Sequence, residues 1–198
     1  MRIFSMLLIT AGIVFLGFGG YQWYATETAQ KNSLAEAKEI IKDSTKETQS
    51  NEEATIDGSN FSPSTGETAG ILHIPKLESD LPIVEGTDED ELEKGVGHYK
   101  GTAYPTQGEQ IVLSGHRDTV FRRMGELELG DILTVKLPYG EFSYEIVDTK
   151  IVSADDRTII KPQGKEVLTL TTCYPFNFIG SAPDRYIITA LPVENGDN

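Results

Sequence analysis

Two hydrophobic patterns divide this chain of 198 residues. From Ile3 to Gly20 no charged residue occurs, and the apolar run continues through an aromatic cluster at residues 21–24. About 20 apolar residues in succession are enough for a helix to span a bilayer. From Gly70 onward, short β-branched or alternating runs are separated by Gly, Pro and Asp, which is typical of strands and turns. The pattern predicts a membrane helix and, after an interval, a β-rich domain.

Charge at the ends of the apolar segment predicts its orientation. Arg2 and the α-amino group are the only positive charges before it, so the short N-terminus is expected in the cytoplasm and the rest of the chain outside. Tyr21, Trp23 and Tyr24 suit the far interface. A cleaved signal peptide is the alternative, but no clear small-x-small cleavage site follows the apolar stretch. We therefore expect residues 1–24 to be an uncleaved, single-pass anchor.

Residues 25–68 are rich in Glu, Lys, Ser, Thr, Asn and Gln and hold too few apolar residues for a core. Leu34, Ala37 and Ile41 recur at helical spacing beside stripes of lysines and acids, which predicts a solvated helix to about Thr48. The sequence after it is typical of a flexible tether. The charged stripes are also compatible with a binding surface, but a solvated spacer is the commoner use of such a pattern.

Residues 69–198 have the length of one domain with a single core. One segment, 87–95, predicts a short helix with Thr87 or Asp88 as its cap and Gly95 as its stop. "LPYGE" has the composition of a tight hairpin turn. Closing the strands into a barrel removes exposed edges, so a small mixed or antiparallel β-barrel is predicted rather than a sandwich. Strands are predicted at 70–75, 81–86, 109–116, 131–137, 141–154, 165–173 and 184–193.

The net charge of −14 limits the partners of this domain. Its field repels phosphate, which argues against nucleic acid or anionic lipid headgroups as a main partner. A peptide or a basic amine is electrostatically more plausible. An unpaired cysteine in an exported chain is inert and buried, paired between molecules, or a reactive thiol.

Cys173 is the only cysteine and ends a predicted strand. Val167, Thr169, Thr171 and Cys173 share one face of that strand, and Leu168, Leu170 and Thr172 share the other. The thiol is expected at a barrel rim within reach of a groove. A small buried hydrophobe is the usual state of a free cysteine, but a histidine at another strand end favours a nucleophile.

Three histidines compete for the role of proton carrier. His116 closes the predicted strand "IVLSGH" and is the best partner for the thiol. His73 is expected to be a partly exposed strand residue, and His98 a loop-borne structural hydrogen-bonder. None has short zinc-ligand spacing to Cys173, so a metal site is disfavoured.

An arginine is the candidate for stabilising negative charge. Arg185 begins the strand 12 positions after Cys173, and if the two strands are antiparallel neighbours their connecting ends meet. Its guanidinium offers several donors to an oxyanion. An ordinary surface salt bridge with Asp184 or another acid is the alternative for an isolated arginine. Asp118 is either an accessory to His116 or a turn residue that caps the backbone.

These segments resemble one family. "TLTTC" at residues 169–173 resembles the TLxTC signature of sortases, the membrane-anchored cysteine transpeptidases of Gram-positive bacteria, and "SGHRDTVF" and "SAPDRYIITA" resemble their histidine and arginine segments. The resemblance covers residues 70–193 and the N-terminal anchor. "TTCYPFNFIGSAPDRY" is most similar to class D, from spore-forming bacteria. The C-terminal anchor and Asp-Pro-aromatic lid of class C are not evident, and calcium activation is doubtful because a solvated helix explains the acids at 87–95.

The resemblance implies a closed β-barrel of about eight strands with one or two short helices. It also implies that Cys173 attacks the threonine carbonyl of an LPxTG- or LPxTA-like sorting signal, that Arg185 stabilises the oxyanion, and that His116 protonates the leaving amine. The thioacyl-enzyme then passes the secreted protein to an amine of a peptidoglycan precursor, lipid II or a stem peptide. Ser114, Thr171 and Thr172 are expected to line the substrate site.

No cofactor or metal is expected, and the catalytic domain is expected to be monomeric, outside the cell membrane of a Gram-positive bacterium. The alternative from another class is a membrane-tethered peptide- or glycan-binding module without chemistry. A cysteine L,D-transpeptidase is disfavoured because an HxxxSxGC-like setting is absent, and a papain-like hydrolase because it usually has more helix and an Asn or Asp partner for the histidine.

Overall fold

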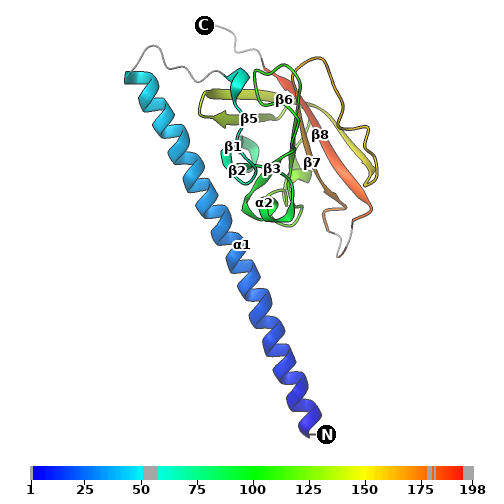
Figure 1. Ribbon diagram of the computed structural model, residues 1–198. Coiled ribbons are helices and arrows are strands. Elements are labelled where there is room, and N and C mark those ends of the chain that lie inside the picture. Colours follow the sequence, from blue (N-terminus) through cyan, green and yellow to red (C-terminus); the bar gives the residue numbers. More distant parts are fainter. Residues whose placement is uncertain (1, 51–57, 178–179, 181, 194–198) are drawn as a thin grey trace.

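Eight strands close into a barrel beside one long N-terminal helix (Figure 1). The computed structural model describes residues 2–50, 58–177, 180 and 182–193. Around the barrel the strand order is β1-β2-β3-β4-β7-β8-β6-β5. The strands are β1 Thr68–Ile74, β2 Ser79–Glu85, β3 Val96–His98, β4 Gln110–Ser114, β5 Ile132–Leu137, β6 Gly140–Ser153, β7 Val167–Tyr174 and β8 Asp184–Pro192. The predicted closed barrel is therefore confirmed.

The barrel mixes parallel and antiparallel pairs. β2 and β3 are parallel, joined by the short helix α2, Glu89–Lys94, and β4 and β7 are also parallel. The remaining pairs are antiparallel, and the predicted hairpin turn joins β5 to β6, with Leu137 opposite Gly140. Because β7 lies between β4 and β8, the ends of these three strands become neighbours in the barrel, although β4 is far from the other two in the sequence.

Alternation along the strands fills the barrel with apolar side chains. In β5 every second residue is buried, and these residues are Leu133, Val135 and Leu137. β7 contributes Leu168 and Leu170 to the same cluster. Burying a side chain of this size stabilises the fold by about 1.5–3 kcal/mol, so the register that points these residues inward also decides which β7 residues point outward.

The long helix α1, Arg2–Ser50, joins the predicted membrane segment and the predicted spacer helix without a break. Its apolar N-terminal part is long and hydrophobic enough to cross a membrane, and in Figure 1 it extends well past the barrel. In the C-terminal half of the helix, one face packs against β1 and β2, and Ser33 and Ala37 are buried. Thr68 donates a 2.6 Å hydrogen bond from Oγ1 to Glu36 Oε2.

The prediction of a solvated spacer helix is therefore wrong for this face. Lys38 Nζ lies 3.7 Å from Asp80 Oδ2 in β2, and Asp80 also contacts the His73 ring nitrogen Nδ1 at 2.7 Å. His73 is partly exposed, as predicted. The small, weakly apolar face of the helix is enough for this packing, because the helix lies on a barrel surface that already exists and needs no core of its own.

Residues 58–67 also differ from the expected flexible tether, while residues 51–57 lie outside the described residues. Gly58–Asn60 form a 3-10 turn, and the Phe61 ring packs edge-on against Tyr104 and Tyr139, with centroids 4.9 and 5.1 Å away. Gln107 donates from Nε2 to the carbonyls of Gly58 and Phe61 at 2.9 and 3.1 Å. A single aromatic anchor orders a segment whose composition is polar.

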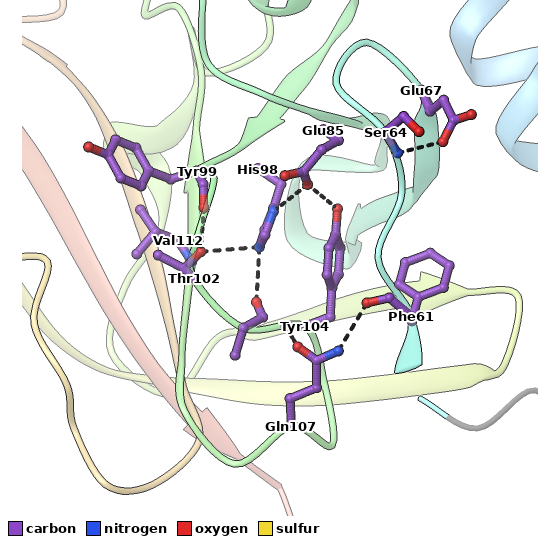
Figure 2. A network of polar contacts seen from close by, with 11 residues as sticks. Phe61, Ser64, Glu67, Glu85, His98, Tyr99, Thr102, Tyr104, Gln107 and Val112 are labelled. Carbon is purple, nitrogen blue, oxygen red and sulfur yellow. Dashed lines mark hydrogen bonds and ion pairs between the residues drawn. The ribbon is translucent and has the colours of Figure 1, made fainter. Parts of the chain in front are cut away.

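The short strand β3 was not predicted, and it places His98 in a buried polar network (Figure 2). His98 is thus a strand residue and not loop-borne, although its predicted role as a structural hydrogen-bonder is confirmed. Its Nδ1 lies 2.6 Å from Glu85 Oε2, and its Nε2 lies 2.9 Å from the Ala103 carbonyl. Polar partners at both ring nitrogens therefore fix the orientation of the His98 ring inside the barrel wall.

Glu85 is held ionised inside this network. Burial alone raises the pKa of this carboxyl group, but the hydrogen bonds and charge of His98, with a 2.8 Å hydrogen bond from the Tyr104 hydroxyl, outweigh burial and keep the pKa below its ordinary value. The Tyr104 ring also stacks on His98 at a centroid distance of 3.9 Å. The network ties β2, β3 and the loop before β4 together.

Candidate active site

A groove of about 630 Å³ brings His116, Cys173 and Arg185 together. Its lining residues come from the ends of β4 and β7, the start of β8, the α2 region, Tyr99 and the segment between β6 and β7. The three side chains predicted to be catalytic come from separate parts of the chain and line the same groove. The other residues lining the groove are Thr87, Leu92, Tyr99, Ser114, Gly115, Ala154, Asp156, Arg157, Ile159, Ile160, Thr171 and Thr172.

Cys173 lies near the C-terminal end of β7 and is half-buried. Leu168 and Leu170 belong to the core, and alternation then places Cys173 on the opposite, outer face of the strand. The predicted division of β7 into two faces is confirmed. The thiol faces the groove and not the interior of the barrel, which makes it accessible to a ligand.

Arg185 lies directly opposite Cys173 in the antiparallel β7–β8 pair. Its Nη1 donates to the carbonyl of Asp184 at 2.9 Å and to that of Ala182 at 3.4 Å. Within the part of the chain that the structure describes, no carboxylate forms an ion pair with Arg185, so the alternative of a salt bridge with Asp184 is wrong. Among the described residues, no carboxylate competes for the guanidinium donors of Arg185, which stands opposite Cys173 in the strand pair.

His116 follows β4 instead of ending it, because the strand stops at Ser114. The intervening Gly115 is packed so closely that a Cβ atom there would lie 2.5 Å from the Phe121 ring. Its N–H donates to the Thr171 carbonyl at 3.2 Å, and its carbonyl accepts a 2.7 Å hydrogen bond from Thr172 Oγ1. The turn that carries His116 is therefore fastened to β7 one and two residues before Cys173.

The remaining predicted site residues separate into two groups. Ser114, Thr171 and Thr172 all line the groove, although the Thr172 hydroxyl is already engaged with the Gly115 carbonyl. Asp118 does not line the groove and is exposed. Its carbonyl, not its carboxylate, accepts hydrogen bonds from Arg122 Nε and Nη2 at 3.0 and 2.6 Å.

Sequence reasoning missed the clamp formed by Arg117. This side chain donates from Nη1 to the Pro175 carbonyl at 3.2 Å and from Nη2 to the Gly180 carbonyl at 2.6 Å, which links the His116 turn to the segment after Cys173. Its place directly after His116 was the one available signal. No cluster of three or more His, Cys, Asp or Glu side chains that could hold a metal ion occurs among the described residues.

Comparison with known proteins agrees with this geometry. Residues 72–193 match the model of the sortase domain, so the chain belongs to the sortase family of cysteine transpeptidases. Within that family it is similar to Sortase D of Bacillus subtilis, with 53% identity over 190 residues, 94% of this chain and 96% of that protein. These findings support membership of class D.

Two solved structures extend the comparison. The catalytic domain of Bacillus anthracis SrtD is 44% identical, with a TM-score of 0.58 over 71% of this chain and 97% of that one. A sortase C from Clostridium perfringens, solved with the C-terminal cell wall sorting motif, is 27% identical, with a TM-score of 0.61 over 81% of this chain and 90% of that one.

Proposed function

We propose that this sortase cleaves an LPxTA- or LPxTG-like sorting signal after its threonine and joins the secreted protein to an amine of a peptidoglycan precursor. The observation that carries the proposal is the groove in which Cys173 faces Arg185 across a strand pair and His116 lines the same cavity. The related sortase C with its sorting motif supports the substrate class. The long apolar part of α1 supports a single-pass anchor, and the positive charge of Arg2 before it supports an orientation with the barrel outside the cell.

The chemistry follows from these three side chains. The Cys173 sulfur, as a thiolate, attacks the threonine carbonyl carbon, and the guanidinium of Arg185 stabilises the resulting oxyanion. The carbon–nitrogen bond breaks, His116 supplies the proton to the departing amine, and a thioester remains. An incoming amine then attacks the thioester, loses a proton to His116 and forms the new amide, while the Cys173 sulfur leaves as the thiolate and the starting state is restored.

Mass spectrometry of the full chain with a small library of LPxTx peptides tests this proposal. The expected result is a covalent adduct on Cys173 with the mass of the peptide up to its threonine, converted to a product when an amine is added. Cys173→Ala is expected to form no adduct, and His116→Ala to lose nearly all turnover. Full cleavage by Cys173→Ala is incompatible with the mechanism.

Asp148 is exposed and does not line the groove, so Asp148→Asn serves as a control and is expected to keep full activity. A binding module without chemistry makes a different prediction. Peptide would bind reversibly, Cys173→Ala would bind as well as the native chain, and no mass change would appear. A thiol-reactive probe that labels Cys173, and is blocked by sorting peptide, separates the two functions further.

A further inference from the structure

A second pocket lies where α1 leaves the apolar segment and passes the barrel. Its volume is about 560 Å³, which lies within the range of ligand sites. None of its residues lines the catalytic groove. α1 contributes Gln22, Trp23 and Gln30 to this pocket, and the turn after His116 contributes Asp118, Val120 and Arg122.

The height of this pocket follows from the continuity of α1. The predicted membrane span ends at Tyr24, and at 1.5 Å per residue the helix rises only about 12 Å from Gln22 to Gln30. The polar layer of one bilayer leaflet is about 5–8 Å deep, by the difference between the hydrocarbon core and the whole bilayer. The pocket therefore opens at or just above the lipid headgroups, given the anchor that forms part of the proposed function.

The pocket contains two unpaired charges of opposite sign. The guanidinium of Arg122 contacts the Asp118 backbone carbonyl, and in the described ranges neither Arg122 nor the Asp118 carboxylate forms an ion pair. The neighbouring charges differ in this respect, because Arg123 pairs with Glu126 at 2.7 Å and Glu27 with Lys31 at 2.6 Å.

An amide in the pocket also lacks a partner. The Nε2 atom of Gln30 is shielded from solvent and makes no hydrogen bond within the described chain. A buried donor without an acceptor destabilises the fold, and a ligand oxygen that reaches it supplies the missing hydrogen bond. Trp23 and Val120 add apolar surface to the same cavity.

We propose that this pocket binds the zwitterionic phosphoethanolamine headgroup of a phospholipid in the outer leaflet. The phosphate contacts the side chains of Arg122 and Gln30, and the ammonium group contacts the Asp118 carboxylate. A headgroup with both charges matches a pocket with both charges, whereas the net charge of −14 repels lipids that are anionic overall. A choline headgroup has no N–H donor for Asp118. The lipid thus holds the turn after His116 against the membrane surface.

Native mass spectrometry of the full chain in detergent micelles tests the proposal. The chain is titrated with phosphatidylethanolamine, phosphatidylcholine and phosphatidylglycerol of the same acyl chains. Phosphatidylethanolamine is expected to form adducts at about tenfold lower concentration than the other two, since one charged hydrogen bond is worth about 1.5 kcal/mol. Arg122→Gln is expected to weaken all adducts, and Asp118→Asn to remove only the preference for ethanolamine.

The matched controls are Lys150→Gln and Asp148→Asn, exposed residues of β6 that carry the same changes of charge and lie outside the pocket. Equal adducts with the three lipids, or equal losses in the controls, would overturn the proposal. Displacement by soluble glycerophosphoethanolamine at millimolar concentration would assign the site to a free phosphate ester and overturn the membrane lipid. Flotation of the full chain with liposomes tests the anchor separately, so failure of the anchor is distinguished from failure of the pocket.

Discussion

Cys173 and Arg185 are direct cross-strand partners at the end of the β7–β8 pair. Side chains of directly opposed residues in antiparallel strands lie with their Cβ atoms about 4.5–5.5 Å apart. A slip of one residue would move either side chain to the other face of the sheet. The buried residues Leu168 and Leu170 resist that slip, so the core of the barrel fixes the relation between thiol and guanidinium.

Replacement of Arg185 by lysine is expected to lower kcat/KM for peptide cleavage by about 100-fold. The ammonium keeps the charge but lacks the planar fork of donors, and loss of one oxyanion donor typically costs a factor of about 100–1000. Cleavage of a labelled LPxTA or LPxTG peptide measures the effect. Arg157→Lys, in the same groove but not opposite Cys173, is the control and is expected to change kcat little. Native kinetics in Arg185→Lys would exclude an oxyanion role.

Thr172→Val tests the fastening of the His116 turn. The valine removes the hydroxyl that donates to the Gly115 carbonyl and leaves that buried acceptor unpaired, which costs about 1–3 kcal/mol of unfolding free energy. Thr172→Ser keeps the hydroxyl and is expected to retain most stability and turnover. Denaturant unfolding and peptide cleavage are measured on both variants. If valine and serine behave alike, the hydrogen bond does not position the turn.

The long alternating segments were predictable from sequence, whereas short or context-dependent features were not. The β7 segment carries its own pattern, so both the strand and the face of Cys173 followed from it. β3 spans only Val96–His98, too short to show a period, and it exists because β2 and β4 flank it. Phe61 had no local signal either, since its partners Tyr104 and Tyr139 are remote in sequence.

The candidate site shows the same division. His116, Cys173 and Arg185 were recognisable because each lies beside a strand end with its own motif. Asp118 was harder to place, because its short separation from His116 in sequence does not reveal which way the turn runs. In the structure the turn places Asp118 in the pocket beside α1. Sequence neighbours within a turn can face different cavities.

The buried Glu85–His98 pair predicts a pH-dependent contribution to stability. The folded state lowers the pKa of Glu85, so the contribution is present above the ordinary pKa of about 4.5 and is lost as the pH falls through the folded value. Glu85→Gln is expected to lower the unfolding free energy by about 3 kcal/mol near neutral pH, with the difference from the native chain shrinking below about pH 4.5.

Denaturant unfolding of the full chain in detergent at several pH values measures this difference. The exposed Glu141, 3.5 Å from Lys136, provides the control, because a surface pair contributes about 0–1 kcal/mol. Glu141→Gln is therefore expected to alter stability little at any pH. A Glu85→Gln difference that stays constant from neutral to acidic pH would show that the ionised carboxylate is not what stabilises the network.

The packing of α1 against the barrel predicts opposite behaviour for two neighbouring alanines. Ala37 is fully buried at the contact with β1 and β2, so Ala37→Glu places an unpaired charge and extra volume there and is expected to separate the helix from the barrel. Ala35 is exposed on the same helix, and Ala35→Glu makes the same chemical change without touching the contact. Hydrogen exchange of the amides at residues 30–44 is expected to accelerate in Ala37→Glu alone, because an undocked polar helix in water is only marginally stable. Equal exchange in the two variants would mean that the helix stands without the barrel, and the height of the catalytic groove above the membrane would then not be fixed by this contact.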